Sequence, residues 1–178
     1  MIAEKPAFVV NMGNAVNLPD NETEWLLLKN TSGPLMRASR YYGVPGTIDG
    51  GSQSFYDFFR LDRARPWYSF ARGNAGFIIV DSAGLNPGGE QMTWLEEEVR
   101  KMGATYPFRF LFLNQPVYSS VEASVRNDLA SVLAPLLRGA GFDLVFSGSG
   151  SFYERLTAEG QTFIVTGGGG APLEEEPP

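Results

Sequence analysis

The sequence of 178 residues contains no histidine and no cysteine. Their absence rules out thiol nucleophiles, Ser-His-Asp triads and ordinary zinc sites. It also removes any disulfide from which a redox compartment might be inferred. Ser147, Ser149 and Ser151 lie close together, but a serine nucleophile needs an adjacent base, and neither His nor a nearby Lys supplies one. We therefore do not expect serine hydrolysis.

Positive charge is also scarce. The net charge is −6 and the pI is about 4.7, and the lysines are Lys5, Lys29 and Lys101. A nucleic-acid or anionic-membrane partner needs a basic face, so neither is expected. No apolar run approaches the roughly 20 residues that span a bilayer, and the first residues do not form a signal peptide. The compartment stays undetermined between cytoplasmic and extracytoplasmic.

The composition of the sequence is typical of a globular protein. Hydrophobic residues make up 43% and aromatic residues 13%. We predict one domain over residues 1–173, followed by an acidic and proline-rich tail at 174–178. Apolar strands are expected at 7–12, 40–44, 108–113, 142–146 and 162–166, with a hairpin at 67–81. Helices are expected from Asn21 as the N-cap, and at 52–60, 90–102 and 123–140. This alternation predicts an α/β fold with a mixed sheet.

Two segments suggest a family. Residues 43–51 read GVPGTIDGG, and residues 145–155 read VFSGSGSFYER. They resemble the Gly-Asn-His-Asp and Ser-Gly-His-x-His-x-Tyr-Glu-Arg signatures of calcineurin-like metallophosphoesterases, in particular the purple-acid-phosphatase-like branch. Weaker similarities keep the same order at 8–16, 68–82, 91–96, 112–119 and 166–172. The resemblance implies a sandwich of two mixed β-sheets flanked by helices. The family's opening strand, with its Asp-x-His motif, has no counterpart, so we expect it to be absent.

The resemblance also implies that the metal-binding motifs are degenerate. The family's two metal ions clamp a phosphate and activate a water molecule. At the matching positions this sequence carries neutral side chains: Asn14, Thr47, Asn114, Ser149 and Ser151 replace ligands, and Ile48 replaces the histidine that assists the leaving group. Neutral amides and hydroxyls do not supply the charge that holds two divalent cations. We therefore expect no catalytic residue, no metal ligand and no cofactor.

Three charged residues of these motifs are retained and form a candidate residual site: Asp49, Glu154 and Arg155. Asp49 is interpreted as a turn cap after Gly46, with residual cation binding as the alternative. Glu154 and Arg155 are interpreted as an ion pair that anchors a loop, with ligand contact as the alternative. The glutamates at 96–98 are expected to face solvent.

The leading hypothesis is a degenerate, non-catalytic metallophosphoesterase-like domain that acts as a binding or structural module, with a protein partner or a second copy of the chain. One alternative is an active phosphoesterase with an oxygen-only ligand set that takes Mn, Fe, Zn or Mg; hard cations suit such a set best. Another is an engineered histidine-free scaffold of this fold. The sequence does not decide among these hypotheses.

Overall fold

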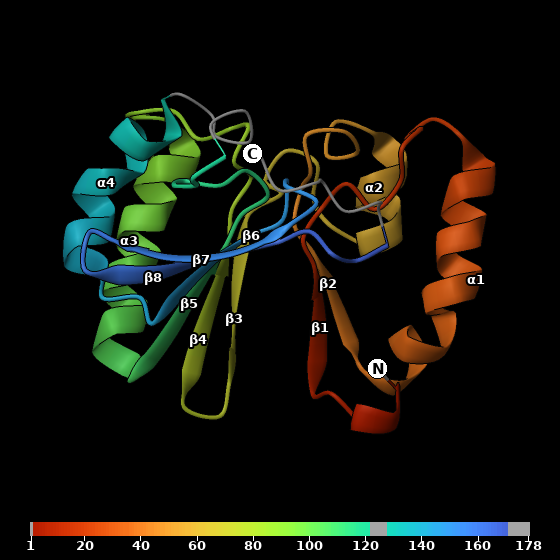
Figure 1. Ribbon diagram of the computed structural model, residues 1–178, viewed down its shortest axis with the longest axis horizontal. Coiled ribbons are helices and arrows are strands. Elements are labelled where there is room, and N and C mark those ends of the chain that lie inside the picture. The colour runs from red at the N-terminus through yellow and green to blue at the C-terminus, as the bar shows by residue number, and fades with distance from the viewer. Residues whose placement is uncertain (1, 122–127, 171–178) are drawn as a thin grey trace.

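The computed structural model describes residues 2–121 and 128–170, and it consists of two β-sheets between two pairs of helices (Figure 1). The first sheet contains two parallel strands, β1 (Phe8–Asn11) and β2 (Arg40–Gly43). The second has the strand order β3-β4-β5-β6-β8-β7. Its members are β3 (Tyr68–Arg72), β4 (Ala75–Ile79), β5 (Phe108–Phe112), β6 (Leu144–Ser147), β7 (Tyr153–Ala158) and β8 (Gln161–Thr166). The central strands are parallel and the two edge strands antiparallel, which confirms the predicted α/β class with a mixed sheet.

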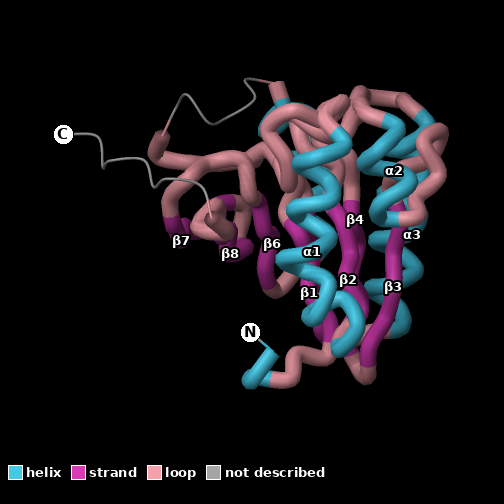
Figure 2. The backbone as a smooth tube through the Cα atoms, turned by 90° about the vertical axis from the view of Figure 1, so that its right-hand side faces the viewer, coloured by secondary structure: helices cyan, strands magenta, loops and turns pink. Residues whose placement is uncertain are grey.

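The helices cover the outer side of each sheet. Helices α1 (Glu22–Ala38) and α2 (Gln53–Phe59) lie beside β1 and β2, as Figure 2 shows from that side. Helices α3 (Glu90–Thr105) and α4 (Leu129–Ala140) cover the six-stranded sheet on the other side of the molecule. A short 3-10 turn, η1 (Ile2–Glu4), precedes β1. Within the described residues, no helix has the length and apolar character that a membrane crossing requires.

Aromatic side chains fill the space between the two sheets. Phe8 of β1 meets Phe77 of β4 edge to face, with ring centroids 5.0 Å apart. Tyr42 of β2 stacks on Phe70 of β3 at 3.9 Å. Such pairs add to the stabilisation from burial of their area. Six of the 13 phenylalanines lie in this inner layer of the sandwich: Phe8, Phe70, Phe77, Phe110, Phe112 and Phe146.

Strand β4 is buried on both faces, and its sequence reflects this. Phe77 and Ile79 point into the layer between the sheets. Ile78, between them, and Val80, just beyond the strand, pack with Leu95 of α3 in the larger cluster under α3 and α4. A continuous apolar run is typical of such a strand, since neither face meets water.

The predicted N-cap at Asn21 is confirmed, and the structure adds a second cap at Ser52. The side chain of Asn21 accepts a hydrogen bond from the Thr23 amide at 2.9 Å, and Ser52 caps α2 through the Phe55 amide at 3.2 Å. The predicted helix over 123–140 is found as α4 in the part of it that the structure describes, from Leu129 to Ala140. Asp128 is the N-cap of α4, which begins at Leu129, while residues 122–127 lie outside the described part.

Strand β7 was not predicted. Residues 153–155 were interpreted as a loop motif, although Tyr153–Ala158 pairs antiparallel with β8 in full register. The strand lies at the edge of the sheet and its residues alternate between exposed and half-buried. An edge strand needs little apolar surface, so β7 is largely polar. The alternation of apolar and polar residues that usually indicates a strand is therefore weak in its sequence.

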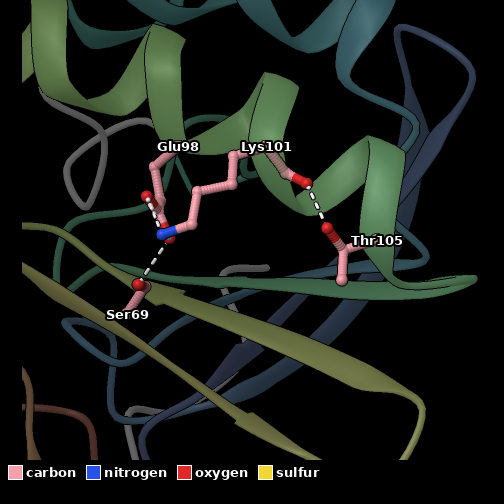
Figure 3. A network of polar contacts seen from close by, with 4 residues as sticks. All are labelled: Ser69, Glu98, Lys101 and Thr105. Carbon is pink, nitrogen blue, oxygen red and sulfur yellow. Dashed lines mark hydrogen bonds and ion pairs between the residues drawn. The ribbon is translucent and has the colours of Figure 1, made fainter.

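The prediction that residues 96–98 all face solvent is wrong for Glu98. This residue is only 7% exposed and accepts a hydrogen bond from the Ser69 hydroxyl at 2.7 Å (Figure 3). The Lys101 ammonium lies 3.1 Å from its carboxylate on the next turn of α3. Glu98 therefore fastens α3 to β3, a contact between elements distant in sequence that a run of three glutamates does not reveal.

Candidate functional site

The ends of β1 and β2 bring the first two degenerate motifs together. Because the strands are parallel, the residues that follow them meet at one edge of the sheet. The Asn14 side chain accepts a hydrogen bond from the Ile48 amide at 3.0 Å and lies 3.4 Å from the Thr47 hydroxyl. Asn14 has a φ of 53°, a left-handed conformation that asparagine tolerates better than most residues. Thr47 and Ile48 are exposed, so this part of the site faces solvent.

Asn114 connects this edge to the second sheet. It follows β5 and is fully buried. Its Nδ2 donates to the Met12 carbonyl at 2.8 Å, and its Oδ1 accepts from the Thr47 amide at 3.1 Å. Its own carbonyl accepts from the amides of Gly148 and Ser149, both at 2.9 Å. One side chain and one carbonyl therefore join the segments after β1, β2 and β6.

Glycines allow these segments to approach so closely. A Cβ atom on Gly13 would lie less than 3.0 Å from the backbone of Gly46 and from the Asn114 side chain, and Gly13 has a φ of 88°. A Cβ atom on Gly148 would collide with the Met12 side chain. The glycines of the motifs are thus required by backbone packing, independently of any metal.

Asp49 is a structural residue in this arrangement. Its carboxylate is fully buried and accepts hydrogen bonds from the amides of Asn14 (3.1 Å), Ala15 (2.6 Å) and Gly46 (3.2 Å). Burial raises the pKa of Asp49, although these backbone hydrogen bonds act to lower it. The contact with Gly46 is the turn cap that the sequence indicated. The contacts with Asn14 and Ala15 join the β2 segment to the β1 segment.

The remaining motif residues are not gathered around Asp49. Ser149 contributes its backbone amide to Asn114, and Ser151 is half-buried in the loop before β7. Glu154 and Arg155 are neighbours on β7 and face opposite sides of it, Glu154 half-buried and Arg155 exposed. Glu154 accepts from the Ser119 hydroxyl at 2.7 Å and from the Ser120 amide at 2.9 Å. In the described residues, serines rather than an arginine thus hold the Glu154 carboxylate.

This contact predicts a pH dependence. Burial acts to raise the pKa of Glu154, but the hydrogen bonds from Ser120 and Ser119 outweigh it and leave the pKa below its usual value. A lowered pKa contributes stability that is present above the unfolded value of about 4.3 and is lost as the pH falls through the folded value. We expect Glu154→Gln to lower the melting temperature at pH 7, and we expect this effect to disappear as the pH falls below the unfolded pKa and through the lower folded pKa. Thermal melts of both proteins over that range check this, and a constant difference at every pH would contradict it.

Two partners of this network were missed from the sequence. The Met12 carbonyl and the Ser119–Ser120 pair carry no motif of their own, although Ser119 ends a segment that matched the family framework. Among residues 2–121 and 128–170, no group of three or more Asp or Glu side chains is placed to hold a metal ion. The described site is a neutral network of amides, hydroxyls and backbone groups with one buried carboxylate beneath it.

The comparisons with known proteins rest on structure. No family model matches the sequence, and no curated protein matches it either. A purple acid phosphatase from yellow lupin seeds superposes with a TM-score of 0.84 at 20% identity, over 99% of this chain and 39% of that one. GAP50, the anchor in the inner membrane complex of Plasmodium, gives 0.71 at 20% identity, over 93% and 62%. A dimetal phosphatase from Danio rerio gives 0.66 at 14% identity, over 92% and 73%.

These similarities establish the fold. The chain has the calcineurin-like metallophosphoesterase fold, as the motif order in its sequence indicated. It spans 39% of the lupin phosphatase and 62% of GAP50. At sequence identities of 14–20%, these similarities show the fold alone. The activity, ligands and partners of this chain must be inferred from the site itself.

Proposed function

We propose that this chain is a non-catalytic metallophosphoesterase-like domain that acts as a binding or structural module. The observation that carries the proposal is the hydrogen-bond network of Asn14, Thr47 and Asn114, whose side chains are bonded to one another or to the backbone. The motif resemblance assigns these three residues to metal-ligand positions of the family. Polar groups satisfied in this way stabilise the loops without a cation.

The donor set does not fit two divalent cations. Asn14 and Thr47 offer neutral oxygens, and the Asn14 oxygen already accepts from the Ile48 amide. The nearest carboxylate, Asp49, is buried and directs its oxygens at three backbone amides. Two ions near each other need several anionic or imidazole ligands to offset their charge. These residues therefore lack the ligands that a metal-activated hydrolysis requires.

A structural neighbour supports the role of a module. GAP50 is described as an anchor, and this chain superposes on it over 93% of its length. In our proposal the domain likewise keeps the fold as a rigid platform and binds another protein or a second copy of the chain. Sedimentation of the purified chain over a range of concentrations distinguishes these two partners, since only self-association depends on the concentration of the chain alone.

A second candidate function is a phosphoesterase with an oxygen-only metal site. Two structural neighbours are phosphatases, and the side-chain oxygens of Asn14 and Thr47 do converge at the strand ends. Hard cations such as Mg²⁺ prefer oxygen ligands. This candidate requires further anionic ligands beyond those that the described residues bring to the site.

Metal analysis separates the two candidates. The purified chain is incubated with Mn²⁺, Fe²⁺, Zn²⁺ or Mg²⁺, desalted, and assayed for bound metal and for hydrolysis of a generic phosphomonoester. We expect near-zero metal and no turnover above buffer, because the neutral donors hold ions too weakly to survive desalting. One or two ions per chain, with turnover that Asn14→Ala abolishes and Asn17→Ala leaves intact, would sink the proposal. Asn17 is a fair control because it is an exposed asparagine three residues away.

A further inference from the structure

A groove on the helix-covered side of the first sheet plays no part in the proposed function. It lies between α1, β2 and α2 and encloses about 750 Å³. This volume is within the range of roughly 300–1,000 Å³ typical of small-molecule sites. None of the degenerate motif residues lines it. The groove is therefore separate from the candidate site at the strand ends.

The charge of this groove is opposite to that of the chain. Four basic residues line it, Lys29, Arg37, Arg40 and Arg60, against one acidic residue, Asp57, which gives 4 − 1 = +3 in a protein whose net charge is −6. In the described part of the chain, no hydrogen bond or ion pair engages these four basic side chains. Clustered cations that outnumber the acids beside them raise the local concentration of anions.

Arg60 occupies a backbone position that does not favour it. It is the C-cap of α2 with φ 57° and ψ 48°, a left-handed conformation. Glycine adopts this conformation without steric cost and is the usual residue there, whereas a side chain with a Cβ atom is disfavoured. The backbone conformation does not favour arginine over glycine at this position. The presence of Arg60 is therefore consistent with a role for its guanidinium in the groove.

The floor of the groove is aromatic. Phe59 stacks on Tyr41 of β2, with ring centroids 6.0 Å apart and planes inclined by 6°. Phe58 lines the same space. Gly43 leaves room for the Phe59 ring, which a Cβ atom at that position would strike. Flat apolar surface beside several guanidinium groups suits a ligand with a planar ring and phosphate groups, because arginine recognises phosphate through paired hydrogen bonds.

We infer that the groove between α1, β2 and α2 binds an organic phosphate of nucleotide size. The phosphates lie against the basic side chains of Arg37 and Arg60, and the planar group lies on the Tyr41 and Phe59 rings. An inorganic phosphate fills too little of the volume to reach both parts. The inference concerns a different surface from the degenerate metal site, so it holds whatever the metal analysis finds.

Calorimetric titration at low ionic strength tests this inference, with ADP and inorganic pyrophosphate as probes. We expect saturable ADP binding that is tighter than pyrophosphate binding and weakens as salt is added. Arg37→Gln should weaken ADP binding about tenfold, the effect of one lost charge-assisted hydrogen bond. Arg60→Gly should weaken it similarly while the melting temperature stays level or rises, because glycine relieves the backbone conformation. Arg72→Gln removes the same charge from an exposed residue at the β3–β4 hairpin and should leave binding unchanged.

Three results would overturn the inference. One is the absence of ADP binding at millimolar concentration in low salt. Another is ADP binding no tighter than that of pyrophosphate, which would remove the role of the aromatic floor. The third is equal binding by the wild type, Arg37→Gln and Arg60→Gly, which would place the anion elsewhere on the molecule.

Discussion

Replacement of Gly46 by alanine is expected to lower the free energy of unfolding by about 3 kcal/mol or more, at the upper end of typical overpacking effects. A Cβ atom at this position would lie less than 3.0 Å from the Asn14 amide nitrogen and from the Asp49 carboxylate. Neither neighbour can move without breaking the hydrogen bonds that Asp49 accepts from Asn14, Ala15 and Gly46. Urea unfolding followed by tryptophan fluorescence measures the change.

Gly51 provides a matched control in the same loop. A Cβ atom there would meet nothing within 4 Å, and its φ is not in the left-handed region. We expect Gly51→Ala to change stability by less than about 0.5 kcal/mol, as is usual for exposed sites. Equal effects of the two substitutions would mean that the β1 and β2 ends are not held as tightly as the structure indicates.

Local signals in the sequence were sufficient for much of the fold. The Asn21 cap, the hairpin at residues 67–81 and the amphipathic helix from Glu90 all depend on contacts close in sequence, and the structure contains each of them. Strand β7 was missed for the opposite reason. An edge strand such as β7 is defined by its partner β8 rather than by its own composition. The stacking of the two sheets followed from the family resemblance and not from any local pattern.

The candidate site could likewise be predicted only in part from the sequence. The sequence indicated that Asn14, Thr47 and Asn114 occupy corresponding ligand positions, and the structure brings them into hydrogen-bond contact. The sequence did not reveal that Asn114 reaches the Met12 carbonyl across 102 positions. Spacing in a chain does not report which acceptor a buried amide finds, because that depends on how the two sheets stack.

Neutral residues in this site hold the loops at the strand ends together by hydrogen bonds. Asn114 is fully buried and satisfied on its amide nitrogen, its amide oxygen and its carbonyl. A buried amide with all partners costs little, whereas one with a missing partner costs about 1–3 kcal/mol. The network around Asn114 therefore holds the strand ends together through neutral groups.

Asp49 tests whether the retained acid is structural or a residual cation ligand. Loss of its carboxylate leaves the amides of Asn14, Ala15 and Gly46 without their acceptor, and each unpaired buried amide costs about 1–3 kcal/mol. We expect Asp49→Ala to lower the free energy of unfolding by about 3 kcal/mol, since part of this region is reached by water. Asp20→Asn, at an exposed acid, should change it by less than about 0.5 kcal/mol.

The pH profile and the effect of metal decide between the two roles of Asp49. Because burial raises its pKa in the folded chain, its contribution to stability is full below the unfolded value of about 3.9 and declines as the pH rises through the folded value. Asp49→Asn stays neutral and should remove this decline, although its amide group turns one donor toward the backbone amides and so recovers only part of the stability lost in Asp49→Ala. Urea unfolding at several pH values, with and without Mg²⁺ or Mn²⁺, measures both effects. A cation ligand predicts that added metal stabilises the wild type and not Asp49→Asn; a structural acceptor predicts that metal changes neither, because the carboxylate oxygens already face three backbone amides.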